Sequence, residues 1–350
     1  MNHSKRINSI DIFRLYCSIL VVAIHINPFS DINSNLGYFV SQILSRIAVP
    51  FFFCVSGYYY IKKLNSNIFC TKQMFIKVFK IYLVWTIIYY TRDIFIYYGD
   101  LNIVQIIRTF VINFFINGSS YHFWYLIGLL FSILFVGLLY KLHLQKYIPA
   151  LALGLYLVGL LGCSYSFLGN KIPLIKIIIN SPKFLLIRRI LLMGFPFFCL
   201  GGYIDKIYSL TKKHAKLNLI ISTFLFIAEI IVVNRFKLGT NIIITIFLPV
   251  LLSSIYVLLL NNPLPQSDLF ALRCHSLANY IYYSHPLLIW GISLVLLIDA
   301  NSTCAFFVVL FLCYVSWRVL FNTNNLFIKK YIIWRKAQPT RFDEIISYDS

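Results

Sequence analysis

A guanidinium and an imidazole lie within the first apolar stretch of the chain. Arg14 and His25 are eleven positions apart, so in a helix they differ by about 20° around the axis and lie about 16 Å apart along it. A neutral imidazole can take a proton from a hydroxyl group or act as a nucleophile. Alternatively, Asp11 and Arg14 form an ion pair and His25 is a structural histidine. Ionisable groups inside a membrane-spanning helix are costly unless they face the bundle interior, so we favour the catalytic interpretation.

The second apolar stretch carries polar residues at two depths. Arg46 lies at about the depth of His25, where it either binds an anion or polar acceptor or extends toward the lipid headgroups. Ser56 and Gly57 lie near the other end, where small residues permit close approach of either a neighbouring helix or a ligand. Both alternatives stay open for each position.

Two lysines mark the inner end of the third apolar stretch. Lys77 and Lys80 fall on one helical face, preceded by further lysines in the loop. In one interpretation they bind phosphate groups. In the other they only reflect the excess of cationic residues on the cytoplasmic side of membrane proteins.

Later stretches add polar residues at depths near that of His25. Asp93 and Glu229 are candidates to fix the tautomer of the His25 ring. His122 and Trp124 begin the fourth stretch, although Trp124 alternatively belongs to the interfacial aromatic belt. His285 precedes a proline, and an ionisable side chain beside a helix kink in a membrane indicates function.

The composition places all these residues in a membrane. The chain of 350 residues is 60% hydrophobic, 18% aromatic and 12% charged, which excludes a water-soluble globule and a disordered chain. Its net charge of +20 is spread between apolar runs and therefore marks membrane topology rather than nucleic-acid binding. The eight cysteines show no close pairs and no metal-ligand spacing, so no metal site is expected.

The apolar runs predict an all-α integral membrane protein with about ten transmembrane helices, because lipid offers the backbone no hydrogen-bond partner. The uneven distribution of Lys and Arg predicts both termini in the cytoplasm. Without a fixed-period repeat or a linker, residues 1–350 form a single domain, with spans over about 10–321 and a short basic tail at 322–350. The expected spans are Ile10–Phe29, Phe39–Ile61, Lys77–Tyr98, Tyr121–Tyr140, Tyr147–Cys163, Phe184–Ile204, Leu217–Asn234, Thr240–Leu260, Leu277–Ile298 and Thr303–Phe321.

The order of these residues resembles membrane acyltransferase family 3, which includes bacterial O-acetyltransferases of the enterobacterial common antigen and O-antigen type. The resemblance covers the chain from Ile10 to about Phe321. One departure concerns Lys77-Val78-Phe79-Lys80, which stands where the family often has Arg-x-x-Arg and so loses the bidentate fork for phosphate. The similarity rests on Asp11-x-x-Arg14 followed by His25, on Arg46 to Tyr58, on Tyr121 to Leu126, and on Ser276 to Pro286.

The resemblance implies an O-acetyltransferase of the bacterial cytoplasmic membrane. Acetyl-CoA is then a co-substrate, no cofactor is tightly bound, and the acceptor is a hydroxyl of a surface polysaccharide or of its lipid-linked sugar precursor. The partners are these substrates and the lipid bilayer, without nucleic acid, and the oligomeric state stays open. A glycan exporter or flippase, or transfer of a larger acyl group such as succinyl, are the alternatives.

The expected site divides into three groups. Arg14 and His25 are the functional pair that the resemblance implies. We expect catalysis from His25, Arg14, Glu229 and His285, donor binding from Lys77, Lys80, Ser56 and Gly57, and acceptor binding from Arg46, Asp93, His122 and Trp124. Arg46, His122 or a helix terminus is also a candidate to stabilise the oxyanion.

Overall fold

The computed structural model describes residues 7–65, 70–97, 102–264, 268–295, 299 and 301–337, and within them all regular structure is helical. The first half contains α1 (Asn8–Ile26), α2 (Ser34–Tyr38), the π-helix η1 (Phe39–Ile43), the 3₁₀-helix η2 (Leu44–Ile47), α3 (Ala48–Leu64), α4 (Cys70–Tyr97), α5 (Ile103–Ile112), the π-helix η3 (Asn113–Asn117), α6 (Trp124–Lys141), η4 (Gln145–Tyr147) and α7 (Ile148–Gly162). The second half contains α8 (Ser166–Gly169), α9 (Pro173–Ile179), α10 (Phe184–Ile187), the π-helix η5 (Arg188–Gly194), α11 (Phe195–Gly201), α12 (Ile204–Thr211), η6 (Lys212–His214), α13 (Ala215–Arg235), α14 (Leu248–Asn261), α15 (Asp268–Val295) and α16 (Thr303–Ala337).

Eight helical segments of the described chain are long and apolar enough to cross a membrane, which confirms a multi-pass helical membrane protein. Seven lie where single spans are expected, and the eighth, Ile204–Arg235, joins α12 to the expected seventh span. Two shorter apolar helices cover Ile103–Ile116 and Leu248–Asn261. The eight are Asn8–Ile26, Ser34–Leu64, Cys70–Ile94, Trp124–Lys141, Gln145–Gly162, Phe184–Gly201, Ile204–Arg235 and Thr303–Leu320.

Several boundaries differ from those expected. The helix expected from Thr240 begins only at Leu248, because the segment before it is irregular. α15 begins at Asp268, well before the expected Leu277, and α16 continues to Ala337 where a tail was expected from residue 322. The expected span ends at Tyr98 and Ile298 and the last part of the tail, 338–350, lie outside the described residues.

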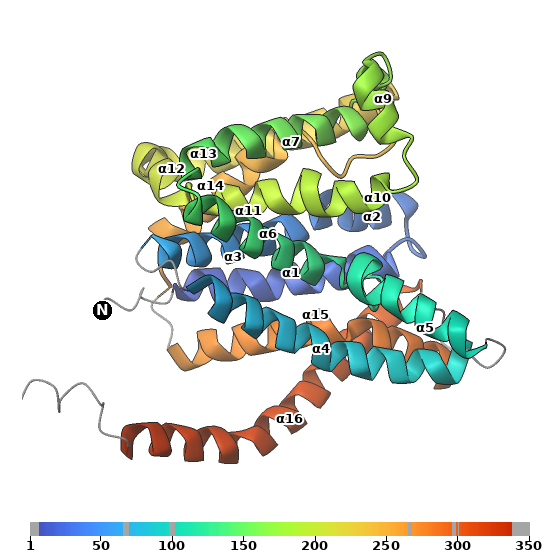
Figure 1. Cartoon of the computed structure of the whole chain (residues 1–350), viewed down its shortest axis with the longest axis vertical. Helices are drawn as coiled ribbons and strands as arrows, with labels where there is room; N and C mark the ends of the chain where they lie inside the picture. Colours follow the sequence, from blue (N-terminus) through green and yellow to red (C-terminus); the bar gives the residue numbers. More distant parts are fainter. Residues whose placement is uncertain are drawn as a thin grey trace, which may run out of the picture.

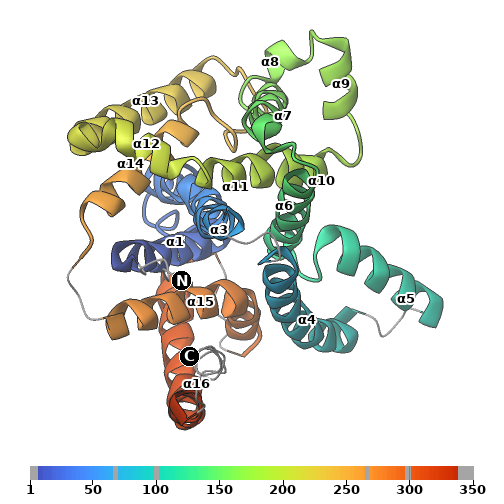
Figure 2. The ribbon, with the colours of Figure 1, turned by 60° about the vertical axis from the view of Figure 1, so that its left-hand side comes forward.

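α5 was not expected from the sequence. Asn102 and Gln105 form a reciprocal capping box at its start, which favours a helix there. With η3 it forms an apolar segment too short to span a membrane, and it extends away from the bundle beside α4 (Figure 2).

The helices lie side by side with their long axes roughly aligned (Figure 1). α1 and α3 lie in the middle of the bundle, α1 packs against α15, and α3 packs against α11. Phe51, Phe53, Phe195 and Phe198 are fully buried in this central core. The elements α2, α5 and α10 lie at the end of the bundle opposite the N-terminus (Figure 1).

Candidate active site

Helices α1 and α15 run parallel and bring two sets of polar residues together. Near the start of α1, Arg14 contacts His275, and near its end the rings of His25 and His285 stack with centroids 5.3 Å apart. The two contacts are eleven residues apart on α1 and ten on α15, so both helices make them without interruption. We call the two sets the arginine layer (Asp11, Arg14, His275, Asn279) and the histidine layer (His25, Tyr121, His122, His285).

The arginine layer is a connected polar cluster. Nη1 of Arg14 lies 2.8 Å from Nδ1 of His275, and Oδ1 of Asp11 lies 3.0 Å from the same nitrogen. The amide of Asn279 lies 3.2 Å from Nε2 of His275. Nε of Arg14 is buried without a hydrogen-bond partner among the described residues, while the Arg14 side chain is 15% exposed. The guanidinium is thus held in place and keeps capacity for a ligand.

The histidine layer gathers three imidazoles and a phenol. The His25 ring centroid lies 4.8 Å from that of Tyr121, and the His122 centroid lies 5.2 Å from that of His285. His122 and His285 are buried, whereas His25 is half-buried. His25 is therefore the histidine of this layer that a substrate can most readily reach.

Backbone contacts set the tautomer of His285. Its Nδ1 lies 2.9 Å from the carbonyl oxygen of Ile281 and 3.0 Å from that of Tyr282. Because a carbonyl oxygen only accepts, Nδ1 carries the proton and Nε2 presents a lone pair. This Nε2 is buried and has no hydrogen-bond partner within the described part of the chain. A buried acceptor without a partner costs about 1–3 kcal/mol, which is characteristic of functional sites.

Asp93 reaches this layer through Arg92. Nε of Arg92 donates to Oδ1 of Asp93 at 2.7 Å, and the Arg92 guanidinium lies 5.0 Å from the centroid of the Tyr89 ring. The Tyr89 ring centroid in turn lies 5.3 Å from that of His122. Asp93 thus neutralises a cation that borders the histidine layer.

Two further arginines are held in place, Arg189 by Trp124 and Arg46 by Gln42. The guanidinium carbon of Arg189 lies 5.4 Å from the centroid of the Trp124 ring. Arg46 is half-buried, and its guanidinium donates to the backbone carbonyl of Gln42 at 3.0 Å and to the Gln42 side-chain oxygen.

Glu229 makes its hydrogen bonds elsewhere. Its carboxylate accepts hydrogen bonds from the Tyr165 hydroxyl at 2.9 Å and from the backbone N–H groups of Ile246 at 2.7 Å and Phe247 at 2.9 Å. These amides lie directly before α14, where a negative charge is favourable at the start of a helix. The contacts do not support the expected role beside His25, and we assign Glu229 to the fold.

Ser56 and Gly57 lie within the packed centre. The Ser56 hydroxyl lies 3.4 Å from the hydroxyl of Tyr125. A Cβ atom on Gly57 would lie 1.8 Å from the carbonyl oxygen of Phe198, so this glycine permits the close contact between α3 and α11. Of the two alternatives for Gly57, its surroundings favour helix packing.

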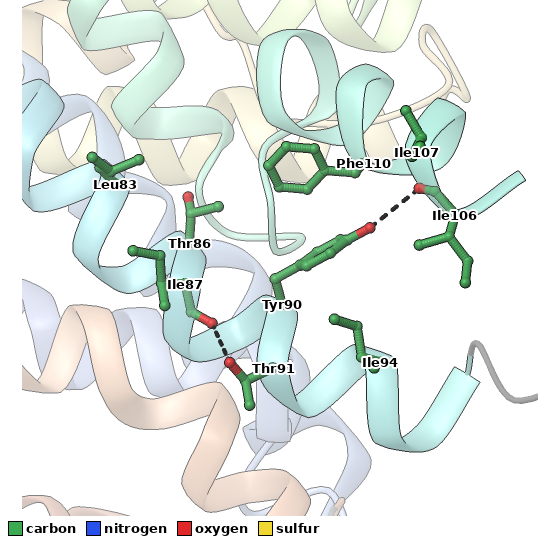
Figure 3. A pocket seen from close by; sticks show the side chains of 9 residues that line it. All are labelled: Leu83, Thr86, Ile87, Tyr90, Thr91, Ile94, Ile106, Ile107 and Phe110. Atoms are coloured by element: carbon green, nitrogen blue, oxygen red, sulfur yellow. Dashed lines mark hydrogen bonds between the residues drawn. The ribbon is translucent and has the colours of Figure 1, made fainter. Parts of the chain in front are cut away.

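Lys77 and Lys80 lie on the exposed side of α4. Neither has a hydrogen-bond or ion-pair partner among the residues described, so both ammonium groups are available to a phosphate. Nearby, a hollow of about 360 Å³ lies between α4 and α5 (Figure 3), with an apolar lining that includes Leu83, Ile94 and Phe110. No expected site residue lines this hollow.

Four residues of the site were not selected from the sequence. These are His275, Asn279, Tyr121 and Arg189. The available signal was a matched spacing: His275 precedes His285 by ten residues as Arg14 precedes His25 by eleven, and Asn279 lies one turn after His275. That signal acquires meaning only when α1 and α15 are known to be parallel neighbours.

The fold and the site together define a helical multi-pass membrane protein with a polar interior. A family model described as "Acyltransferase domain" matches residues 7–318, and the chain belongs to this family, acyltransferase family 3. It is 28% identical over 334 residues to an amino-acid racemase of Enterococcus faecalis, covering 91% of this chain and 47% of that protein. It is 34% identical over 171 residues to a serine/alanine racemase of Enterococcus gallinarum, covering 47% of this chain and 24% of that protein. The chain thus spans about half the length of the first relative. No solved structure matches it.

Proposed function

We propose that this protein transfers an acetyl group from cytoplasmic acetyl-CoA to a hydroxyl group of a surface glycan or its lipid-linked precursor. The observation that carries the proposal is the half-buried His25 in a membrane-spanning helix, stacked on His285 in a layer of ionisable side chains. Membership of acyltransferase family 3 supports acyl transfer as the reaction class.

The arginine layer is suited to the donor. Arg14 is fixed by His275 yet keeps a buried donor nitrogen, and Lys77 and Lys80 offer exposed ammonium groups. We assign the phosphates of coenzyme A to these cations, because charge-assisted hydrogen bonds to phosphate are the strong ones. The acyl end then extends along α1 by about 16 Å to reach His25.

His25 supplies the proton transfer. The imidazole takes the proton of the acceptor hydroxyl while the hydroxyl oxygen attacks the thioester carbonyl carbon. The carbon–oxygen bond forms, the carbon–sulfur bond breaks, and the proton passes to the departing thiolate. The stacked His285 ring and the neighbouring Tyr121 ring orient the imidazole.

The racemase names belong to longer relatives, of which this chain matches half or less, and racemisation is not part of the proposal. The acyl group and the sugar are inferred from the resemblance of the motifs. A larger acyl group such as succinyl fits the same chemistry.

The test is acetyl transfer in membranes. Vesicles containing the protein receive radiolabelled acetyl-CoA, and label is measured in extracted glycan. We expect incorporation with the unaltered chain and a fall of about 10²–10⁴-fold with His25→Ala, because this is the usual contribution of a general base. His214→Ala, an exposed histidine between α12 and α13, is the matched control. Glycan export without label would instead indicate a transporter, and equal labelling by His25→Ala would refute the catalytic assignment.

A further inference from the structure

Three arginines near the histidine layer lack an acidic partner. Arg46 lies in η2, and Arg188 and Arg189 open the π-helix η5. Arg14 and Arg92 each have an aspartate within 4.0 Å, whereas none of these three forms an ion pair with any described residue. All three lie in segments long and apolar enough to cross a membrane, where an unpaired charge is costly.

The arginine-bearing segments pack against the helices that carry the histidine layer. η2 packs against α1, which holds His25, and η5 packs against α6, which begins directly after Tyr121 and His122. Arg188 and Arg189 are consecutive residues of η5. Cations gathered beside one site repel each other, and an anion bound between them relieves that repulsion.

The arginines are also held in place rather than free in solvent. Gln42 binds the Arg46 guanidinium, and Arg189 lies over Trp124. Nε of Arg188 is buried and has no hydrogen-bond partner among the described residues. A buried donor nitrogen without a partner is expensive unless a ligand satisfies it.

The local backbone is irregular at both arginine-bearing segments. The π-helix η1 and the 3₁₀-helix η2 precede or contain Arg46, and η5 carries the other pair. Short π-helical segments occur frequently at functional sites. If the arginines only anchored helices in lipid, a regular α-helix at both segments would have had the lower free energy.

We propose that Arg46, Arg188 and Arg189 bind an oxyanion, a carboxylate or phosphate carried by the acceptor, and place it beside His25. The acceptor is then an acidic sugar or a phosphate-linked sugar rather than a neutral one. The assignment of this anion to the acceptor rests on the proposed function. The binding of an oxyanion does not.

Binding is measured on the full-length protein in a phosphate-free, uncharged detergent. Inorganic phosphate, glucuronate and glucose are added in turn, and thermal unfolding and equilibrium binding are followed. We expect phosphate or glucuronate to raise the unfolding temperature and glucose to leave it unchanged. Arg188→Gln and Arg189→Gln should each weaken binding of the effective anion at least about tenfold, as expected when a charge-assisted hydrogen bond is lost. Arg235→Gln, at the exposed end of α13, should not.

The pattern of results separates the sources of the anion. A response to glucuronate indicates an acidic sugar, and a response to phosphate alone indicates a phosphate-linked sugar. No response to either anion, or equal binding by the arginine variants, overturns the proposal. So does occupation by phosphatidylglycerol that neither anion displaces, because the arginines would then only anchor the bilayer.

The inference and the proposed function fail differently. If anion binding depends on Arg188 and Arg189 but no acetyl group is transferred, the proposed function is refuted and the oxyanion site is supported. Acetylation of a neutral glycan at equal rates by the unaltered chain and the arginine variants would refute the site and keep the function.

Discussion

Nη1 of Arg14 lies 2.8 Å from Nδ1 of His275, and this contact joins helices that are more than 240 residues apart in the chain. Oδ1 of Asp11 lies 3.0 Å from the same ring nitrogen. Nδ1 of His275 can either accept a hydrogen bond from Arg14 or donate one to Asp11, but it cannot do both at once. The protonation of this one nitrogen therefore decides which of the two side chains it binds. The ion pair within α1 is in this way extended to α15.

Arg14→Lys and His275→Gln should weaken donor binding. Each change removes the contact that fixes the guanidinium, so we expect the KM for acetyl-CoA to rise about tenfold, equivalent to about 1.4 kcal/mol, with kcat little changed. Because the residues touch, the double variant should lose less than the sum of the two. Steady-state kinetics measure this, with exposed Arg318→Lys as control. Additive losses would show that the two side chains act separately.

Glu229→Gln should destabilise the fold. The amide can keep only one accepting oxygen, and its NH₂ group would face an N–H of Ile246 or Phe247. We expect a loss of about 1–3 kcal/mol, the usual cost of leaving buried polar groups unpaired. Thermal unfolding in detergent measures it. Asp205→Asn, which removes the exposed ion pair with Lys62 and leaves an amide oxygen to accept from the Tyr58 hydroxyl, should cost under about 1 kcal/mol. An unchanged unfolding temperature together with abolished acyl transfer would instead support a catalytic role for Glu229.

Gly57→Ala should separate α3 from α11. The new methyl group would lie 1.8 Å from the carbonyl oxygen of Phe198, and both atoms belong to packed helix segments. We expect poor folding or a markedly lower unfolding temperature. Gly154→Ala is the matched control, because no described residue outside its own stretch of α7 lies within 4 Å of its Cβ position, and there alanine should stabilise by about 0.5–1 kcal/mol. Similar effects of the two substitutions would contradict the close helix contact.

Asp31 should make the docking of α16 depend on pH. Hydrogen bonds from the hydroxyl and backbone N–H of Thr303, the first residue of α16, lower the pKa of this exposed carboxylate. A lowered pKa in the folded state stabilises the fold above the unfolded value of about 3.9 and loses that stabilisation as the pH falls through the folded value. Protection from hydrogen exchange at the start of α16, corrected for the intrinsic exchange rate at each pH, should therefore fall below about pH 4, and less so in Asp31→Asn. Asp299→Asn serves as control, and an identical pH profile in both variants would exclude Asp31.

The helices themselves follow from the sequence because long apolar runs leave the backbone no other solution in lipid. The common level of His25 and His285 also follows, since position along a helix converts directly into depth, whereas His122 lies in the turn before α6. The pairing of Arg14 with His275 does not follow, because it requires the neighbours of α1 to be known.

Irregular segments account for most remaining differences. The segment from Thr240 to Phe247 is apolar enough to resemble a helix, yet it is held in an irregular conformation by Glu229 and by the Ser164 hydroxyl, which donates to the Ile244 carbonyl at 2.6 Å. Such tertiary hydrogen bonds leave no periodic signal. The π-helix η5 is equally hidden from a search for helical periodicity.

The uninterrupted course of α1 has a mechanical consequence. Arg14 and His25 lie in one continuous helix, so a rigid tilt of α1 against α15 would displace both side chains together.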